Sequence, residues 1–137
     1  MSGDARGRLR FSDFQLERTA TGQCRARVAL AWPSHKPCVG EAAGLASQAG
    51  EMRCAAQACI HAIAQATGDA KFELVGVKAV RAFDATVVIA SLATQGILDG
   101  PRVVGSSLVQ DDVPRGAALA VLNATNRLLS GRPTPRR

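Results

Sequence analysis

The clearest pattern along the chain is an alternation of apolar and polar positions between Gln23 and Trp32. A period of two is typical of a β-strand that buries one face. The positions on the apolar face are Cys24, Ala26, Val28, Leu30 and Trp32. Arg25 and Arg27 lie on the opposite face, so the segment predicts a sheet that is covered on one side and partly open on the other.

Shorter apolar runs predict five further strands. They are expected at residues 9–18, 38–43, 71–81, 86–94 and 102–109. The apolar phase changes between Phe11 and Phe14, which predicts either a bulge near Ser12-Asp13 or a strand that starts only at Phe14. The short link of residues 82–85 predicts a hairpin. The continuous apolar run of residues 87–89 is typical of a strand that is buried on both faces.

Two segments follow the helical period instead. Apolar residues recur every three or four positions from Glu51 to Thr67, and Gly68 is expected to end this helix. The predicted buried stripe is Met52, Ala55, Ala56, Cys59, Ile60 and Ile63. Asp111 or Asp112 is expected to cap the second helix. Its predicted buried stripe is Val113, Ala117, Ala120, Val121, Ala124 and Leu128.

The predicted order is strand, strand, strand, helix, and it occurs twice. Val39-Gly40 aligns with Val104-Gly105, and the helical segment CAAQACIHA (54–62) aligns with GAALAVLNA (116–124). The two registers differ by three residues, which places an insertion or deletion in the turn between strand and helix. Two such halves can cover each other. The expected fold class is α+β, with two pseudo-symmetric βββα repeats and helices packed on one side of antiparallel sheets.

The repeats define a single expected domain at residues 9–130, with repeat one at 9–68 and repeat two at 69–130. Residues 1–8 and 131–137 are expected to be disordered basic tails. The net charge of +6 lies mostly in these ends, which leaves the body close to neutral. Because 47% of the 137 residues are hydrophobic, the body suits a folded protein.

Basic tails attract polyanions without sequence preference, so nucleic acid is an alternative partner. Solvated ends with no partner are the simpler interpretation. A basic sheet face for RNA can be assembled from Arg25, Arg27, Lys78 and Arg81, but only four Phe and one Trp are available for base stacking. No apolar run approaches the roughly 20 residues that span a bilayer, and no secretory signal is found, so a cytoplasmic protein without membrane contact is expected.

The four cysteines show neither a C-x-x-C motif nor the paired spacing of a zinc site. They are Cys24, Cys38, Cys54 and Cys59. Cys54 and Cys59 are five residues apart on a predicted helix, so they point in different directions. With His35 and His61 a metal site stays geometrically open, but buried free thiols in a reducing cytosol are the simpler interpretation. We expect no metal and no cofactor.

Polar residues around the second helix are the first candidates for chemistry. Asp111 and Asp112 can act as paired carboxylates or hold a cation, but their place just ahead of a helix favours capping. Asn123 and Asn126 can hold a ligand amide or carboxylate, or can satisfy the helix end or an interface. His61 occupies the position equivalent to Asn123, which makes this pair the most specific polar signal in the repeat.

Two further arrangements can be assembled. Residues 44–50 are expected to form a small-residue turn, and the segment Gly40–Gly44 can cradle an anion at the start of the helix that follows. Ser106-Ser107, His35 and Asp84 can be combined into a nucleophilic triad, but no G-x-S-x-G motif surrounds either serine. Because no coherent catalytic set is found, we expect that the protein is not an enzyme.

Several short motifs carry a resemblance to a known family. The segment Phe83–Val87 precedes a strand and a helix that ends at Ala124–Leu128 with the sequence ATNRL, and the segment Gly40–Gly44 precedes an alanine-rich helix with Ala55-Ala56. In these motifs residues 14–129 resemble the C-terminal regulatory domain of 2-isopropylmalate synthase and its relatives. The resemblance implies a pseudo-twofold pair of βββα units that dimerises and binds the end-product amino acid at the dimer interface.

The chain also departs from that family. The family places this domain behind a catalytic barrel, and nothing in the sequence corresponds to a barrel. Residues 43–48 lack the acidic residue that the family has before the first helix, whereas the second half retains Asp111-Asp112. These differences favour stand-alone use as a dimerising or oligomerising module over inherited leucine binding.

We therefore expect a non-catalytic regulatory or assembly module that forms a homodimer or a higher oligomer and can bind a small metabolite. The candidate ligand-binding residues are Gly40, Gly44, His61, Asp84, Gly105, Asp111, Asp112, Asn123 and Asn126. The alternative is a nucleic-acid-associated protein that uses arginine-rich tails and a basic sheet face.

Overall fold

The computed structural model describes residues 8–68, 71–95 and 102–130. Apart from Arg8, the expected basic tails lie outside these residues. The elements are β1 (Arg10–Arg18), β2 (Gln23–Ala31), β3 (Cys38–Leu45), α1 (Gln48–Thr67), β4 (Lys71–Ala82), β5 (Ala85–Gln95), β6 (Val103–Val109) and α2 (Val113–Ser130). Within the described residues, neither helix is long and apolar enough to cross a membrane.

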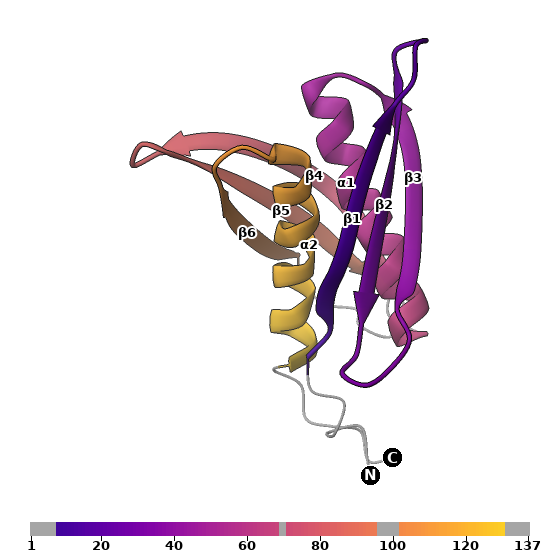
Figure 1. The fold of residues 1–137 in the computed structure, drawn as a ribbon. Helices are drawn as coiled ribbons and strands as arrows, with labels where there is room; N and C mark the ends of the chain where they lie inside the picture. The colour runs from indigo at the N-terminus through magenta and orange to yellow at the C-terminus, as the bar shows by residue number, and fades with distance from the viewer. Residues whose placement is uncertain (1–7, 69–70, 96–101, 131–137) are drawn as a thin grey trace.

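The strands form two antiparallel sheets, ordered β1-β2-β3 and β4-β5-β6. Helix α1 packs on β2 and β3, helix α2 packs on β5 and β6, and the two helices contact each other. They lie side by side on the inner sides of the sheets (Figure 1). The expected α+β fold of two βββα repeats, with helices on one side of each sheet, is therefore confirmed.

The core lies between the inner sheet faces and the helices. The alternation predicted for β2 is confirmed, since Cys24, Ala26, Val28 and Leu30 are at most 1% exposed. Just past the end of this strand, Trp32 is half-buried, and its Nε1 donates a hydrogen bond to the carbonyl of Ala66, 3.1 Å away. The helices contribute mainly alanines to this core, so they lie close to the strands that they cover.

The predicted bulge and hairpin are both confirmed. The register of β1 shifts between Phe11 and Asp13, where β1 pairs with β2. Strands β4 and β5 meet in a two-residue turn in which Phe83 and Asp84 have φ angles of 54° and 61°. Two consecutive left-handed residues make a type I′ turn, which matches the natural twist of a hairpin.

Two predictions about local structure are wrong. Strand β3 continues through Gly44 to Leu45 and α1 begins at Gln48, so the expected turn at 44–50 is mostly strand and helix. The helix starts early because Ser47 acts as its N-cap, with Oγ accepting a hydrogen bond from the N–H of Gly50 at 3.0 Å. Strand β5 is not buried on both faces, because the helices cover only its inner side and Ile89 is 36% exposed.

A strand glycine lies against helix backbone at the same place in each repeat. A Cβ atom on Gly40 would clash with the carbonyl of Ala58, and one on Gly105 would clash with the carbonyl of Ala120. The step along the chain from Gly40 to Gly105 is three residues longer than the step from Ala58 to Ala120. This is the three-residue difference between the repeats that the sequence comparison predicts. Small residues on both elements therefore set how closely each helix approaches its sheet.

We predict that Gly40→Ala and Gly105→Ala each lower the free energy of unfolding by about 1–3 kcal/mol, because the added methyl group overpacks a backbone contact. Gly76→Ala is the matched control in β4, since a Cβ atom there meets nothing within 4 Å and its φ is not positive. It should change stability by less than about 0.5 kcal/mol. Urea unfolding measures all three, and equal effects would contradict the close-approach argument.

Candidate functional site

The predicted anion cradle at Gly40–Gly44 is not a turn at a helix N-terminus. Gly40 lies in the middle of β3 against the third and fourth turns of α1, and a Cβ atom on Gly44 would lie 2.7 Å from Cys54 Sγ. Gly105 has the equivalent place in β6 against α2. All three glycines are therefore packing positions, where the space above the strand is filled by a helix.

His61 and Asn123 make equivalent contacts in the two repeats. Asn123 Nδ2 donates a hydrogen bond to the carbonyl of Ser106, and His61 Nδ1 bonds the carbonyl of Glu41, each at 2.8 Å. Because a carbonyl can only accept, the His61 proton sits on Nδ1 in this arrangement. Both carbonyls follow the strand glycine on an edge strand, β3 or β6. His61 and Asn123, which the repeat places at equivalent positions, therefore each join a helix by a hydrogen bond to the edge strand beneath it.

Asn126 lies at a different place and joins the two repeats. Its side chain is 4% exposed, and Nδ2 donates a hydrogen bond to the carbonyl of Leu9, 2.9 Å away. This bond ties the C-terminal half of α2 to the residue that precedes β1. The amide predicted to meet a ligand is therefore used inside the chain.

The aspartates fall at two further places. Asp112 caps α2, since its Oδ1 accepts from the N–H of Arg115 at 3.1 Å and its carbonyl accepts from the N–H of Gly116 at 3.0 Å. The capping interpretation is confirmed for Asp112, and Asp111 is exposed just ahead of it. Asp84 lies at the tip of the β4–β5 hairpin, which projects away from the helices (Figure 1). The nine candidate residues do not converge on one site.

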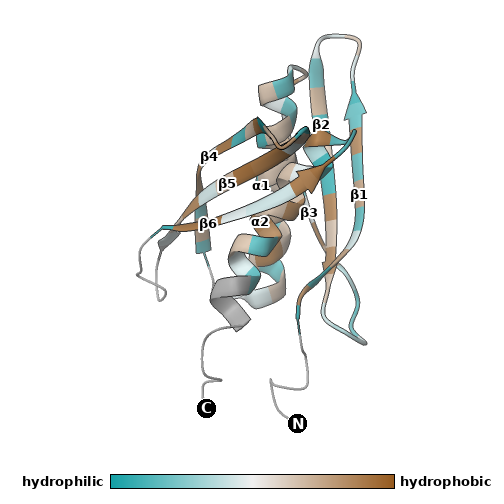
Figure 2. Cartoon of the chain, turned by 90° about the vertical axis from the view of Figure 1, so that its left-hand side faces the viewer, coloured by the Kyte–Doolittle hydropathy of each residue, from teal (hydrophilic) through white to brown (hydrophobic). Residues whose placement is uncertain are grey.

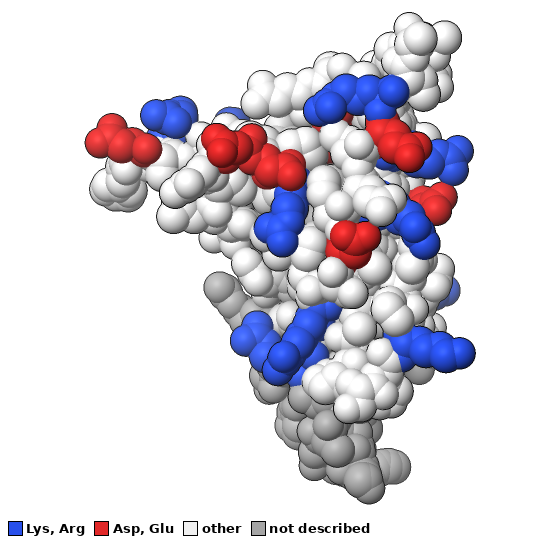
Figure 3. Space-filling model, in the orientation of Figure 1, with Lys and Arg blue, Asp and Glu red and all other residues white. Residues whose placement is uncertain are grey.

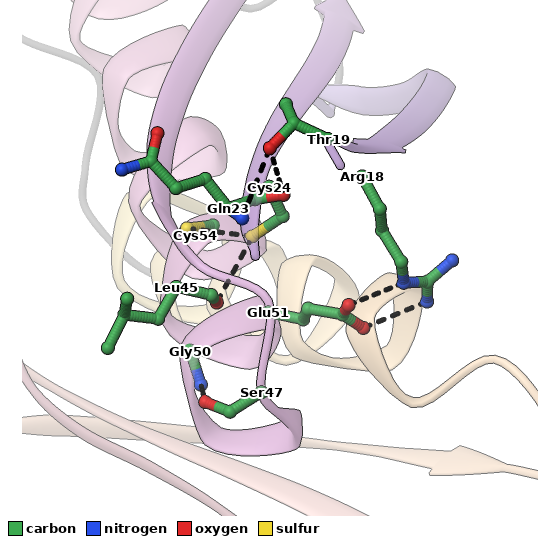
Figure 4. Close-up of polar contacts among 9 residues, drawn as sticks. All are labelled: Arg18, Thr19, Gln23, Cys24, Leu45, Ser47, Gly50, Glu51 and Cys54. Atoms are coloured by element: carbon green, nitrogen blue, oxygen red, sulfur yellow. Dashed lines mark hydrogen bonds and ion pairs between the residues drawn. The ribbon is translucent and has the colours of Figure 1, made fainter. Parts of the chain in front are cut away.

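The polar contacts that sequence reasoning missed are gathered around the start of α1. Arg18 Nε lies 2.5 Å from Glu51 Oε2, and Arg18 Nη2 lies 2.9 Å from Oε1. Glu51 is only 7% exposed, and its hydrogen bonds and charge raise the pKa of Arg18. This two-bonded pair ties β1 to α1 (Figure 4). The signal in the sequence was an acidic residue in the first turn of a helix.

Two buried thiols lie beside that ion pair. Cys24 Sγ is 3.4 Å from Cys54 Sγ and 3.4 Å from the carbonyl oxygen of Leu45 (Figure 4). The cysteines of this chain are free, as the sequence predicts. No group of three or more His, Cys, Asp or Glu side chains is arranged to hold a metal ion within residues 8–68, 71–95 and 102–126.

The outer face of the first sheet is charged. Arg25 and Arg27 point outward from β2, and both contact Glu41 on β3, at 3.2 and 3.8 Å. Lys78 and Arg81 belong to β4 in the other sheet, so the single basic sheet face predicted for RNA is wrong. Basic and acidic side chains are interspersed over the upper part of the face in Figure 3.

The outer face of the second sheet is mainly aliphatic, although Lys78 and Ser106 lie on it at either side of Ile89. The residues that define this outer apolar face are Val80, Val87, Ile89, Val104 and Leu108. Val80, Val87 and Leu108 form one row across the three strands by register. Leu108 is 71% exposed and Val104 is 49% exposed. Figure 2 shows this sheet in front of the helices, with hydrophobic colour along β4 and β5. The fully exposed Phe83 lies at the hairpin tip beside it.

No model of a known protein family and no curated protein matches this chain. The side chains of the outer apolar face lie on the side of the sheet away from both helices, so packing within the chain does not account for them.

We predict different costs for the two helix asparagines. Asn126→Ala should lower stability by about 1–3 kcal/mol, because it leaves the buried Leu9 carbonyl without its partner. Asn123→Ala, on an exposed part of the same helix, should cost only about 0.5–1.5 kcal/mol, because water can reach the carbonyl of Ser106. Thermal and urea unfolding of both variants measure the difference, and a larger loss in Asn123→Ala would contradict these roles.

Proposed function

We propose that this chain is a non-catalytic assembly module that associates with a second copy of itself through the outer apolar face of β4-β5-β6. The observation that supports the proposal is the set of exposed aliphatic side chains on one face of a regular sheet. Single exposed aliphatic residues are ordinary on soluble proteins, but a continuous apolar surface marks an interaction site. Here Val80, Val87 and Leu108 are direct neighbours across the three strands, and the next row on the same face has Ile89 between Lys78 and Ser106.

A second copy is the occupant that fits the chemistry of the two sheets. The outer face of β1-β2-β3 carries ion-paired side chains such as Arg25 and Glu41, so it does not complement an aliphatic surface. Two copies of the outer apolar face do complement each other. Their association about a twofold axis gives a closed dimer, with sheets stacked about 10 Å apart as in a β-sandwich.

Edge-to-edge pairing of the same sheets is less favoured. The β4 edge carries Lys71, Lys78 and Arg81 and is interrupted by a bulge between Leu74 and Gly76. Charges and bulges on an edge strand oppose pairing with another chain. On the β6 edge, the carbonyl of Ser106 already accepts a hydrogen bond from Asn123. Face-to-face stacking of two sheets does not require either edge strand to pair with another chain.

The resemblance to the regulatory domain of 2-isopropylmalate synthase supports the same proposal, because that domain dimerises. It also supports a regulatory part of the proposal, in which the dimer binds a small metabolite between the copies. That part depends on the resemblance, since Asn123, Asn126 and Asp112 already have partners within the chain.

We predict that the protein is a dimer at micromolar concentration in analytical ultracentrifugation. Leu108→Glu should raise the dissociation constant at least tenfold, equivalent to about 1.4 kcal/mol, because it buries a charge in the interface. Gln15→Glu is the matched control, since it introduces the same charge on the exposed outer side of the first sheet. A monomeric wild type, or equal effects of the two variants, would show that the outer apolar face is not the interface.

A further inference from the structure

Two thiols from separate elements meet where β2 begins and α1 completes its second turn. Cys24 is the second residue of β2 and is 1% exposed, and Cys54 on α1 is 4% exposed. Their sulfur atoms are 3.4 Å apart although the residues are 30 positions apart in the sequence. A disulfide has sulfur atoms about 2.05 Å apart, so bond formation requires an approach of roughly 1.4 Å.

The contacts around the pair hold its two elements in place. Glu51 lies one turn before Cys54 on α1, and its two bonds to Arg18 fix that turn against β1. The cap at Ser47 fixes the start of the helix. The side chains in Figure 4 show this cluster on the end of α1 nearest the β1–β2 turn. Because these contacts hold the two elements, rotation of the two side chains is the movement by which the sulfurs would approach each other.

The equivalent positions in the second repeat show that close packing at this place does not require two thiols. The register and the helix alignment make Thr86, Val109 and Gly116 the equivalents of Cys24, Gly44 and Cys54. In that repeat the valine side chain on the strand fills the space above Gly116. In the first repeat the space above Gly44 is filled by Cys54 Sγ instead. A sulfur pair is thus a specific feature of repeat one.

We propose that Cys24 and Cys54 are an oxidation site that closes into a disulfide in the presence of a peroxide and locks β2 to α1. One thiolate attacks an oxygen of hydrogen peroxide, which forms a sulfenic acid and releases hydroxide. The second thiol attacks the sulfenic sulfur, which forms the S–S bond and releases water. Two thiols and one peroxide give one disulfide and two waters, with the sulfurs oxidised and the peroxide reduced.

The rate of this reaction depends on pH. Burial, and then the hydrogen bond with Cys24, raise the pKa of the Cys54 thiol to about 12. Because the thiolate is the nucleophile, attack by Cys54 on peroxide is slow at neutral pH and should accelerate by up to about tenfold per pH unit below the pKa of this thiol.

The full chain treated with hydrogen peroxide tests the proposal. Alkylation of remaining thiols followed by peptide mass spectrometry should show an intramolecular link between Cys24 and Cys54, with the loss of two hydrogens and reversal by dithiothreitol. The link should persist in Cys38→Ser and Cys59→Ala, and be lost in Cys24→Ala and Cys54→Ala. Mapping of the wild type alone decides the outcome if a variant does not fold. Links that involve Cys38 or Cys59, or over-oxidation without a link, would overturn the proposal.

Thermal unfolding provides a second readout. A bond that closes a loop of about 30 residues without straining the fold should raise the melting temperature of the oxidised chain by at least about 5 °C over the reduced chain. Cys54→Ala treated with peroxide in the same way is the control and should show no rise. An unchanged or lowered melting temperature in the linked wild type would mean that the thiols are not prearranged for the bond.

Discussion

The close contact between strand glycines and helix backbone is the constraint on which the rest of this structure depends. Gly40 under Ala58, and Gly105 under Ala120, bring each helix directly onto an edge strand. At that separation, His61 and Asn123 reach the carbonyl that follows each glycine. In each repeat the helix and the edge strand, joined by this hydrogen bond, form one unit. The two units pack together through α1 and α2. Since both helices are on the inner sides, the outer face of each sheet is left open.

The two repeats share this backbone arrangement and differ in what they present outward. The first sheet presents ion-paired side chains, including Arg25, Arg27 and Glu41. The second presents mainly aliphatic ones, of which Leu108 is the most exposed, with Lys78 as a charged residue on the same face. Because the shared internal contacts do not require either surface, the difference is best explained by separate roles for the two faces. This contrast is why self-assembly, rather than catalysis or nucleic-acid binding, is the function that we propose.

Near the start of each helix, the two repeats place the larger of two facing side chains on different elements. In repeat one the strand has Gly44 and the helix has Cys54, whereas in repeat two the strand has Val109 and the helix has Gly116. Total volume is kept while the chemistry changes, which is the substitution that a close-packed core tolerates best. It also places Cys54 against Cys24, next to the Arg18–Glu51 pair that anchors α1.

The sequence by itself determined the order of the elements and the internal repeat, indicated the bulge in β1 and narrowed the cap of α2 to Asp111 or Asp112, because each follows from local periodicity or from a short-range hydrogen bond. It misplaced the start of α1, since a serine cap among small residues gives a weak signal. The partners of His61, Asn123 and Asn126, the Arg18–Glu51 pair and the thiol contact were decided only by the tertiary structure. These contacts join residues 17 to 117 positions apart, so they exist only once the helices lie on their sheets. The exposure of the outer face of β5 was also decided by the tertiary structure. A continuous apolar run has the same sequence pattern whether or not a further layer covers that face.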